Sequence, residues 1–307
     1  MRARLLTIDS GYVRPGFAAC YLRVQGDEAA YVETNTSHAV PKLLEALQAE
    51  GLSPEQVRWI VVTHVHLDHA GGAATLLQHC PNATLVAHPR AARHLIDPSR
   101  LVASSKQVYG EEIFEKLYGE IPPAPAERVR AVEDGEVLEL GGAPLHFLHV
   151  RGHANHHFVV HDPERDTVYT GDAFGLAYPY LQRAGRFVFA STSPTDFDGP
   201  EAKRSVDRIR ELGTRTACLT HFGELDEIEA MAEQLHAWLD FSQELYERIR
   251  ELPPQEREET AYRALLGHME QAAQRRGLSL TKEDWELLSL DMRLNAQGLA
   301  YAASRNR

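Results

Sequence analysis

The sequence predicts an α/β fold followed by a purely helical region. Up to about residue 225, short apolar runs of strand length alternate with segments whose apolar residues recur at helical spacing. From residue 226 onward only the helical spacing remains. We therefore expect an α/β domain over residues 1–225 and a C-terminal helical extension over residues 226–307.

The first half of the α/β domain alternates strands with helices. A helix is expected over 40–50, because Val40, Leu43 and Leu47 share one helical face and Gly51 follows as a stop. The other expected elements are strands 17–25 and 29–33, strand 57–62, helix 73–80, strand 83–87 and helix 89–96.

Residues 97–127 contain a proline at 98 and a proline-rich stretch at 122–125, around one short helical segment near 109–118. We interpret this region as an insertion that covers the sheet. Further strands are expected over 128–132, 136–140, 144–149, 157–161 and 166–170, followed by helix 200–212 and strand 216–219.

Three helices are expected in the extension, over 225–251, 255–276 and 281–304. Thr281 followed by Asp284 resembles a capping box, with Asp in place of the usual Glu or Gln. The extension either packs against the domain, or covers the functional site, or forms a homodimer surface. The sequence leaves these alternatives open.

Composition describes an ordinary globular protein, with 43% apolar and 25% charged residues among 307. The net charge of −12 disfavours nucleic acid and anionic membranes as partners and leaves a small-molecule substrate. The N-terminus lacks the apolar core of a signal peptide, and no apolar run reaches the ~20 residues of a membrane span. The three cysteines are isolated. We expect a cytoplasmic protein.

The stretch 63–72, Thr-His-Val-His-Leu-Asp-His-Ala-Gly-Gly, carries most of the chemical information. It follows the strand-like run 59–62 and brings together the side chains of His64, His66, Asp68 and His69. Imidazole and carboxylate are ligands for zinc, iron and manganese. Because such a cluster would be costly to bury without a cation, we expect a metal site, with two metals.

The order H-x-H-x-D-H followed by a small residue and glycines resembles the signature of the metallo-β-lactamase superfamily. Three downstream segments match the family in the right order, each at the end of an apolar run. They are Gly152–His157 with His153, Thr170-Gly171-Asp172, and Thr220-His221-Phe222-Gly223. The resemblance covers residues 5 to 225 and implies a four-layer αββα sandwich.

By this resemblance, one metal is held by His64, His66 and His153, and the other by Asp68, His69 and His221. Asp172 would bridge them. The resemblance implies a metal-bound hydroxide as the nucleophile, and Asp68 either assists proton transfer or only ligates. Zinc is the expected metal, with iron and manganese as alternatives.

Most of the sixteen histidines have no such context. His157 is expected to orient its neighbours. His88 is expected to make a structural hydrogen bond, with a place facing the site as the alternative. His149 and His156 are expected either to support the ligands or to have structural roles. Residues 174–195, rich in aromatic side chains, are interpreted either as a substrate wall or as ordinary loop packing. In the first case Tyr178 or Tyr180 would supply an oxyanion donor.

One departure from the family concerns residues 33–36, Glu-Thr-Asn-Thr, where many members have an Asp-x-Gly turn. This departure puts the local geometry in question, but not metal binding.

The resemblance favours a dinuclear metal-dependent hydrolase of a small ester, thioester or lactone. The alternatives are a di-iron protein that binds or reduces dioxygen, and a regulatory protein that acts through its helical tail. Phosphodiester cleavage is disfavoured by the net charge.

Overall fold

The computed structural model describes residues 3–192 and 196–305. The chain divides into two compact units. The first unit consists of Met1–His149, His156–Gly171 and Thr214–Asp226. The second consists of Val150–Asn155, Asp172–Gly213 and Glu227–Arg307. The expected boundary after residue 225 falls where the chain enters the second unit for the last time, but the extension shares that unit with two earlier segments.

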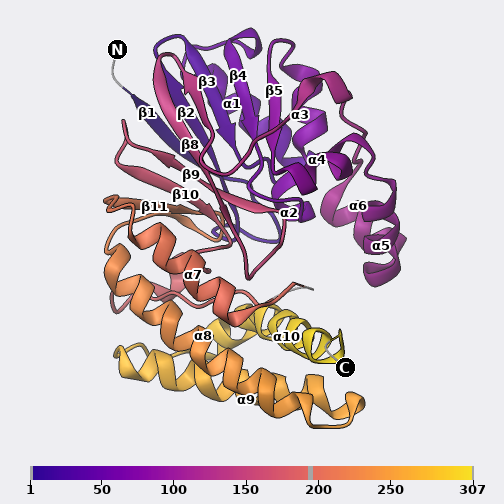
Figure 1. Ribbon diagram of the computed structural model, residues 1–307, viewed down its shortest axis with the longest axis vertical. Helices are drawn as coiled ribbons and strands as arrows, with labels where there is room; N and C mark the ends of the chain where they lie inside the picture. The colour runs from indigo at the N-terminus through magenta and orange to yellow at the C-terminus, as the bar shows by residue number, and fades with distance from the viewer. Residues whose placement is uncertain (1–2, 193–195, 306–307) are drawn as a thin grey trace. The chain divides into compact units, whose positions relative to one another are not determined.

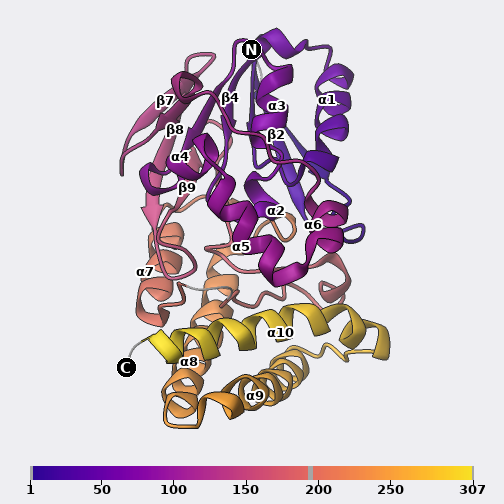
Figure 2. The ribbon, with the colours of Figure 1, turned by 90° about the vertical axis from the view of Figure 1, so that its right-hand side faces the viewer.

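Two six-stranded sheets form the frame of the first unit (Figures 1 and 2). The first sheet has the order β1-β2-β3-β4-β5-β6, antiparallel from β1 to β3 and parallel from β3 to β6. Its strands are β1 (Arg4–Asp9), β2 (Ala19–Gln25), β3 (Glu28–Val32), β4 (Val57–Val61), β5 (Thr84–Ala87) and β6 (Val129–Ala131).

The second sheet has the order β12-β11-β10-β9-β8-β7, in which β10 and β11 run parallel. Its strands are β7 (Val137–Leu140), β8 (Ala143–Val150), β9 (His157–Asp162), β10 (Thr167–Gly171), β11 (Thr216–Leu219) and β12 (Gly223–Leu225). The strands expected from the sequence are all present. The expected strand 128–132, however, corresponds to β6 and belongs to the first sheet, and β12 was not expected.

Alternation along the strands supplies two separate cores. On β2, Leu22 faces a core that the first sheet shares with helices α1 (Val40–Ala49), α3 (Ala73–His79) and α4 (Pro89–Ile96). Tyr21 faces the opposite way, into a core between the two sheets that includes Phe147 and Phe158. Arg23 and Asp162, both fully buried, form an ion pair across this second core at 2.5 Å.

The region 97–127 contains two helices, α5 (Ser99–Tyr109) and α6 (Glu111–Tyr118), where one was predicted. Pro98 is the N-cap residue of α5 and so begins this helix. No side chain described on α5 is fully buried, so its sequence carries only a weak apolar stripe. The short helix α2 (Leu67–Ala70) lies within the histidine-rich stretch.

The described residues of the second unit include four α-helices and irregular segments, one of which contains a 3-10 turn at Pro179–Leu181. The helices are α7 (Gly199–Arg210), α8 (Ile228–Arg250), α9 (Pro254–Arg275) and α10 (Lys282–Arg305), close to the predicted bounds (Figure 1). The predicted capping box begins α10, because the Thr281 backbone donates to Asp284 Oδ2 at 2.7 Å and the Asp284 backbone donates to Thr281 Oγ1 at 3.2 Å. Among the described residues, no helix is both long and apolar enough to cross a bilayer.

The aromatic segment that follows β10 lies in the interior of the second unit. Phe174, Tyr178 and Phe189 are 0% exposed. The Tyr178 hydroxyl donates to Asp291 on α10 at 2.8 Å, and Thr192 is hydrogen-bonded to Asn295 on the same helix. Of the two interpretations, loop packing therefore describes these side chains, and Tyr178 is committed to Asp291. The last residues of the proposed wall, 193–195, lie outside the described residues.

Candidate metal centre

Residues 33–36 hold the histidine-rich turn in place. The Thr34 backbone and hydroxyl both donate to the His69 carbonyl, at 3.0 and 2.9 Å, and the Asn35 amide donates to the Asp68 carbonyl at 2.8 Å. The approach is so close that a Cβ on Gly72 would lie 2.6 Å from the Thr36 carbonyl oxygen. The Glu-Thr-Asn-Thr stretch thus supplies a well-defined geometry without the Asp-x-Gly turn, and the two positions after Ala70 require glycine.

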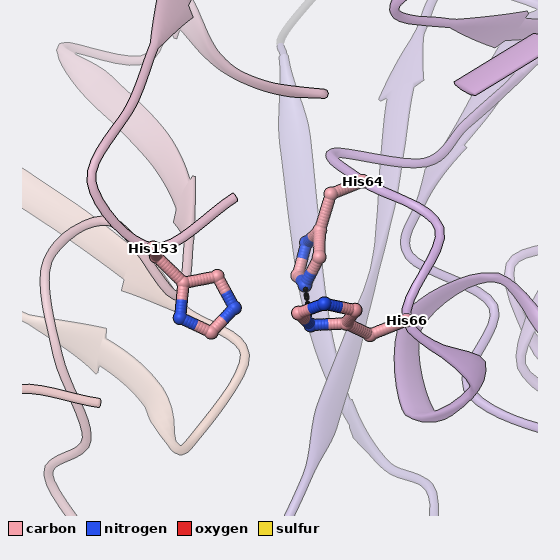
Figure 3. A group of neighbouring side chains, drawn as sticks. All are labelled: His64, His66 and His153. Carbon is pink, nitrogen blue, oxygen red and sulfur yellow. Dashed lines mark hydrogen bonds between the residues drawn. The ribbon is translucent and has the colours of Figure 1, made fainter. Parts of the chain in front are cut away.

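Five predicted ligands come together in the first unit. The donor atoms of Asp68, His69 and His221 lie within 4.8 Å of one another. Asp68 Oδ2 is 3.3 Å from His221 Nε2 and 3.9 Å from His69 Nε2. His64 Nε2 and His66 Nδ1 face each other at 2.8 Å (Figure 3). His64 and His69 are fully buried and His221 is 3% exposed, so these groups meet in the interior.

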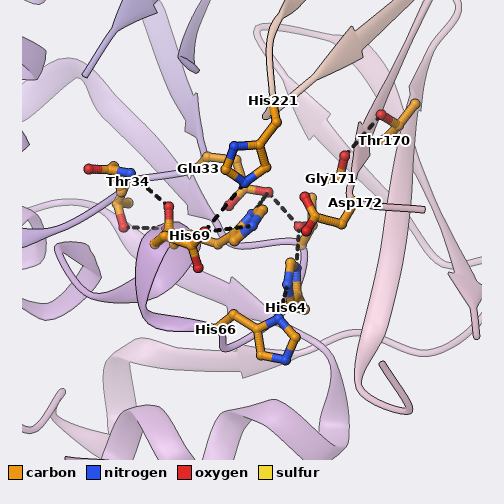
Figure 4. A network of polar contacts seen from close by, with 12 residues as sticks. Glu33, Thr34, His64, His66, His69, Thr170, Gly171, Asp172 and His221 are labelled. Carbon is orange, nitrogen blue, oxygen red and sulfur yellow. Dashed lines mark hydrogen bonds and ion pairs between the residues drawn. The ribbon is translucent and has the colours of Figure 1, made fainter. Parts of the chain in front are cut away.

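Glu33 is a candidate positioning residue that the sequence interpretation missed. It directly follows β3, its backbone φ is +67°, and its carboxylate is 1% exposed. Glu33 Oε1 accepts a short hydrogen bond from the Thr63 hydroxyl and lies 3.5 Å from His69 Nδ1 (Figure 4). The sequence did show an acidic residue directly after a strand-like apolar run. It was overlooked because the family pattern has Asp, and not Glu, at this turn.

These contacts select the tautomer of two imidazoles. Because the Thr63 hydroxyl gives its proton to Glu33, it can only accept from His64 Nδ1, which lies 3.1 Å away. His64 Nε2 then carries the lone pair. Glu33 Oε1 also lies 3.5 Å from His69 Nδ1, so its negative charge favours a proton on that nitrogen and leaves Nε2 as the ligating atom.

His221 is oriented by the backbone. Its Nδ1 lies 2.8 Å from the Phe17 carbonyl oxygen, which can only accept, so Nδ1 carries the proton and Nε2 points its lone pair toward Asp68. The Phe17 ring packs against the imidazole edge-on at 5.3 Å between centroids. Sequence reasoning gave no sign of this contact, because it joins residues far apart in the chain.

His157, which was expected to orient its neighbours, packs directly against a predicted ligand. Its ring stacks on that of His64 with 4.6 Å between centroids and is 1% exposed. Gly171 allows this packing, because a Cβ there would lie 2.6 Å from His157 Nε2.

Two predicted ligands, His153 and Asp172, belong to the second unit. His153 lies on the turn after β8 (Figure 3), and its Nε2 is 3.5 Å from Asp172 Oδ2. The preceding Gly152 has φ +99° and packs onto α7, where a Cβ would lie 2.6 Å from the Ala202 Cβ. The Gly152 carbonyl also accepts from the Asp198 backbone at 3.0 Å, just before α7. The start of α7 therefore fixes the turn that presents His153.

Two of the remaining candidates, His88 and His149, make hydrogen bonds with the backbone. His88 Nδ1 accepts from the Arg90 backbone at 3.0 Å and so caps α4. His149 Nε2 donates to the Val132 carbonyl at 2.9 Å. The structural hydrogen bond expected of His88 is confirmed.

The three cysteines are buried thiols and take no part in this site. Burial raises the pKa of Cys80 to about 12, and burial, with the Glu33 charge as a smaller contribution, raises the pKa of Cys20 well above its usual value. Because a thiolate is the reactive and ligating form, neither group is suited to nucleophilic attack or metal binding at neutral pH.

The residues of the first unit fit a divalent metal. Within the described part of the chain, Glu33 pairs with no lysine or arginine, and its Oε2 has no hydrogen-bond partner. A buried carboxylate in this state is costly unless a cation balances it. The imidazole lone pairs selected above, together with Asp68, are the donors that zinc and iron prefer.

The profile of the metallo-beta-lactamase superfamily matches residues 13–221, more than half of the chain. Among curated relatives, the metallo-beta-lactamase fold-containing protein ST1585 of Sulfurisphaera tokodaii is 28% identical over 55% of this chain and 62% of its own length. The lactamase-like protein nscB of Arthroderma otae is 23% identical over 61% of this chain and 44% of its own. The chain thus spans less than two thirds of either relative.

Solved structures extend the similarity of fold to the whole chain. The structure of ST1585 from Sulfolobus tokodaii has a TM-score of 0.66 at 21% identity, covering 97% of this chain and 98% of that one. That of the family protein TTHA1429 from Thermus thermophilus also has a TM-score of 0.66, at 23% identity, covering 98% and 92%. The expected metallo-β-lactamase fold with a C-terminal helical region is confirmed.

Proposed function

Because the chain belongs to the metallo-β-lactamase superfamily, we propose that it binds two divalent metal ions and hydrolyses a small ester, thioester or lactone. The observation that carries this proposal is the cluster of Asp68 with the buried His69 and His221, close to the Glu33 carboxylate that no lysine or arginine balances among the described residues. It supports a cation at this place and a polar reaction beside it.

In the proposed site, His64, His66 and His153 would hold one metal and Asp68, His69 and His221 would hold the other. Asp172 would be shared between them. When bound, two such cations lower the pKa of a water molecule and polarise a carbonyl oxygen. Zinc is the proposed metal. Iron also suits these donors, and a di-iron protein that binds dioxygen is the second candidate.

The protein's own groups hold the ligands in their ligating form. The Phe17 carbonyl and the Thr63 hydroxyl keep the Nδ1 protons on His221 and His64, and the Glu33 charge favours the same tautomer in His69. Asp68 is more exposed to solvent than the histidines of its cluster. Its side chain is 27% exposed, whereas those of His69 and His221 are at most 4% exposed, so Asp68 is the group placed to pass a proton to solvent.

Metal analysis of the purified protein and a substrate panel test this proposal. We expect about two metals per chain and hydrolysis of an activated ester, thioester or lactone in preference to a phosphodiester. Asp172→Asn should lower metal content and turnover together, because it removes the bridging charge. Asp240→Asn, which alters an exposed carboxylate on α8, is the matched control and should change neither.

Retention of both metals by Asp172→Asn would overturn the bridging assignment. Two irons with a visible charge-transfer band and little turnover of any ester would favour the di-iron candidate instead.

A further inference from the structure

Helix α10 has a second apolar face besides the one that packs within its own unit. The inward face carries Leu288, Met292 and Leu299, all 0% exposed, where α10 packs across α8 and α9 (Figure 2). Leu290 and Tyr301, by contrast, are 42% and 48% exposed. They are two of the five exposed large apolar side chains in the described part of the chain.

These outward side chains belong to a stripe at helical spacing. Leu287 and Leu294 are partly exposed and lie seven residues apart, with Leu290 between them and Tyr301 seven residues further on. Residues at such spacing share one face of a helix, as the a and d positions of a coiled coil do. We call Leu287, Leu290, Leu294 and Tyr301 the α10 stripe. A contiguous exposed apolar surface of this kind marks an interaction site, whereas single scattered residues do not.

The stripe carries opposite charges at its two ends. Glu283 is exposed at the start of α10, and Arg305 is the last residue of the helix. The Arg305 side chain is 56% exposed, although it also contacts Asp196 at 3.3 Å. Both residues lie eleven positions from Leu294 and so on the same face of the helix as the stripe. An antiparallel copy of this surface is therefore electrostatically complementary to it.

The stripe is also symmetric about Leu294. Leu287 and Tyr301 are each seven residues from it, as Glu283 and Arg305 are each eleven. In a two-fold contact, a residue on one side of the axis meets the residue that lies equally far on the other side. A second copy placed antiparallel, with the axis at Leu294, brings Leu287 onto Tyr301 and Glu283 toward Arg305. Antiparallel helix dipoles favour the same orientation.

We propose that the protein forms a homodimer by antiparallel pairing of the α10 stripes of two copies. The matched spacing about Leu294 favours a second copy over an unrelated partner, because only a self-complementary contact requires it. The stripe contains no predicted metal ligand, so this proposal does not depend on the proposed function.

Analytical ultracentrifugation of the full chain over a wide range of concentrations tests the proposal. We expect a concentration-dependent dimer with twice the chain mass of 34.4 kDa. Leu290→Glu should raise the dimer dissociation constant by about 100-fold or more, because it buries a carboxylate from each copy in an apolar contact. Circular dichroism of the variant should match that of wild type, since Leu290 is exposed on the single chain.

Ile113→Glu on α6 is the matched control, because this side chain is 53% exposed but lies outside the stripe. It should dimerise like wild type. A protein that is monomeric at every concentration, or a dimer that Leu290→Glu leaves unchanged, would overturn the proposal.

Disulfide formation between copies tests the antiparallel orientation. The native cysteines are buried, so an added surface cysteine is the one that reacts. Leu294→Cys should give a covalent dimer on oxidation, because its two copies meet at the axis and packed helices bring facing Cα atoms within disulfide range. Leu287→Cys should not, because its two copies are fourteen residues, or ~21 Å, apart along the pair. Failure of Leu294→Cys to cross-link, or a covalent dimer of Leu287→Cys, would overturn the antiparallel arrangement.

Discussion

The Glu33 carboxylate lies in the interior of the first unit and interacts with two imidazoles. One contact is direct, to His69 Nδ1, and the other passes through the Thr63 hydroxyl to His64. Partners of this kind orient a metal-bound imidazole and raise its basicity. Glu33 is therefore a positioning residue for the proposed metal site.

Glu33→Gln should weaken metal binding by about 10- to 100-fold, the usual effect of removing such a partner. The amide has nearly the same shape but no negative charge. Competition with a chromogenic chelator measures the affinity, and Glu45→Gln on the exposed face of α1 serves as the control. Equal affinities in wild type and Glu33→Gln would contradict the assigned role.

The residues that meet in the cluster could be predicted from the sequence because the spacing of the histidine-rich turn is local and specific, and metal binding by them stays a prediction. The partners that orient these residues could not be predicted. Phe17 reaches His221 from 204 positions away, through a backbone carbonyl that any residue could provide. Glu33 departs from the residue type expected at its place.

A histidine on α9 packs against aromatic side chains of α8. His268 stacks on Phe241 with 3.8 Å between ring centroids and meets Trp238 edge-on at 4.9 Å. Burial, with the Arg275 charge as a smaller contribution, lowers the pKa of His268 to about 4. The folded state therefore favours the neutral form of the His268 ring.

This depressed pKa predicts a loss of stability in mild acid. Above about pH 6.5 the ring is neutral in both states and has no effect on stability. As the pH falls from 6.5 toward 4, His268 becomes protonated in the unfolded chain while it stays neutral in the folded chain. Proton binding therefore favours unfolding over this range. The melting temperature of His268→Phe should therefore fall less over this range than that of wild type.

The control for this measurement is His79→Gln, an exposed histidine on α3, which should follow the wild-type curve. Parallel curves for wild type and His268→Phe would show that the ring titrates normally.

At the level of elements, most helices followed from periodicity because they have one buried and one exposed face. Central strands such as β2 and β10 are buried on both faces and followed instead from short, continuous apolar runs. Helix α5 did not follow from periodicity, since none of its described side chains is fully buried. The role of residues 174–192 was also ambiguous. Aromatic side chains beside a predicted metal ligand suit either a binding surface or a core, and only the contacts with α10 distinguish the two.

The two sheets of the first unit are joined by a buried ion pair within an otherwise apolar core. Arg23 on β2 and Asp162 on β9 have no solvent exposure. Such a pair contributes little net stability over well-packed apolar residues, but removing one partner leaves a buried charge.

Asp162→Asn should therefore lower the free energy of unfolding by about 3–5 kcal/mol, measured by urea denaturation. The double variant Arg23→Met/Asp162→Leu should recover most of that loss. A change of less than about 1 kcal/mol in the single variant would mean that the Arg23 charge finds another partner.

The second unit is composed of Val150–Asn155, Asp172–Gly213 and Glu227–Arg307, separated along the chain by parts of the first. This arrangement has a consequence for biosynthesis. The segment that carries Asp172 leaves the ribosome well before α10, whose Asp291 and Asn295 are its partners. Until α10 has been synthesised, the core that buries Phe174 and Phe189 is incomplete, so this apolar segment of the nascent chain is prone to aggregation. The contacts that hold the segment beside the proposed ligand Asp172 also form only at that stage.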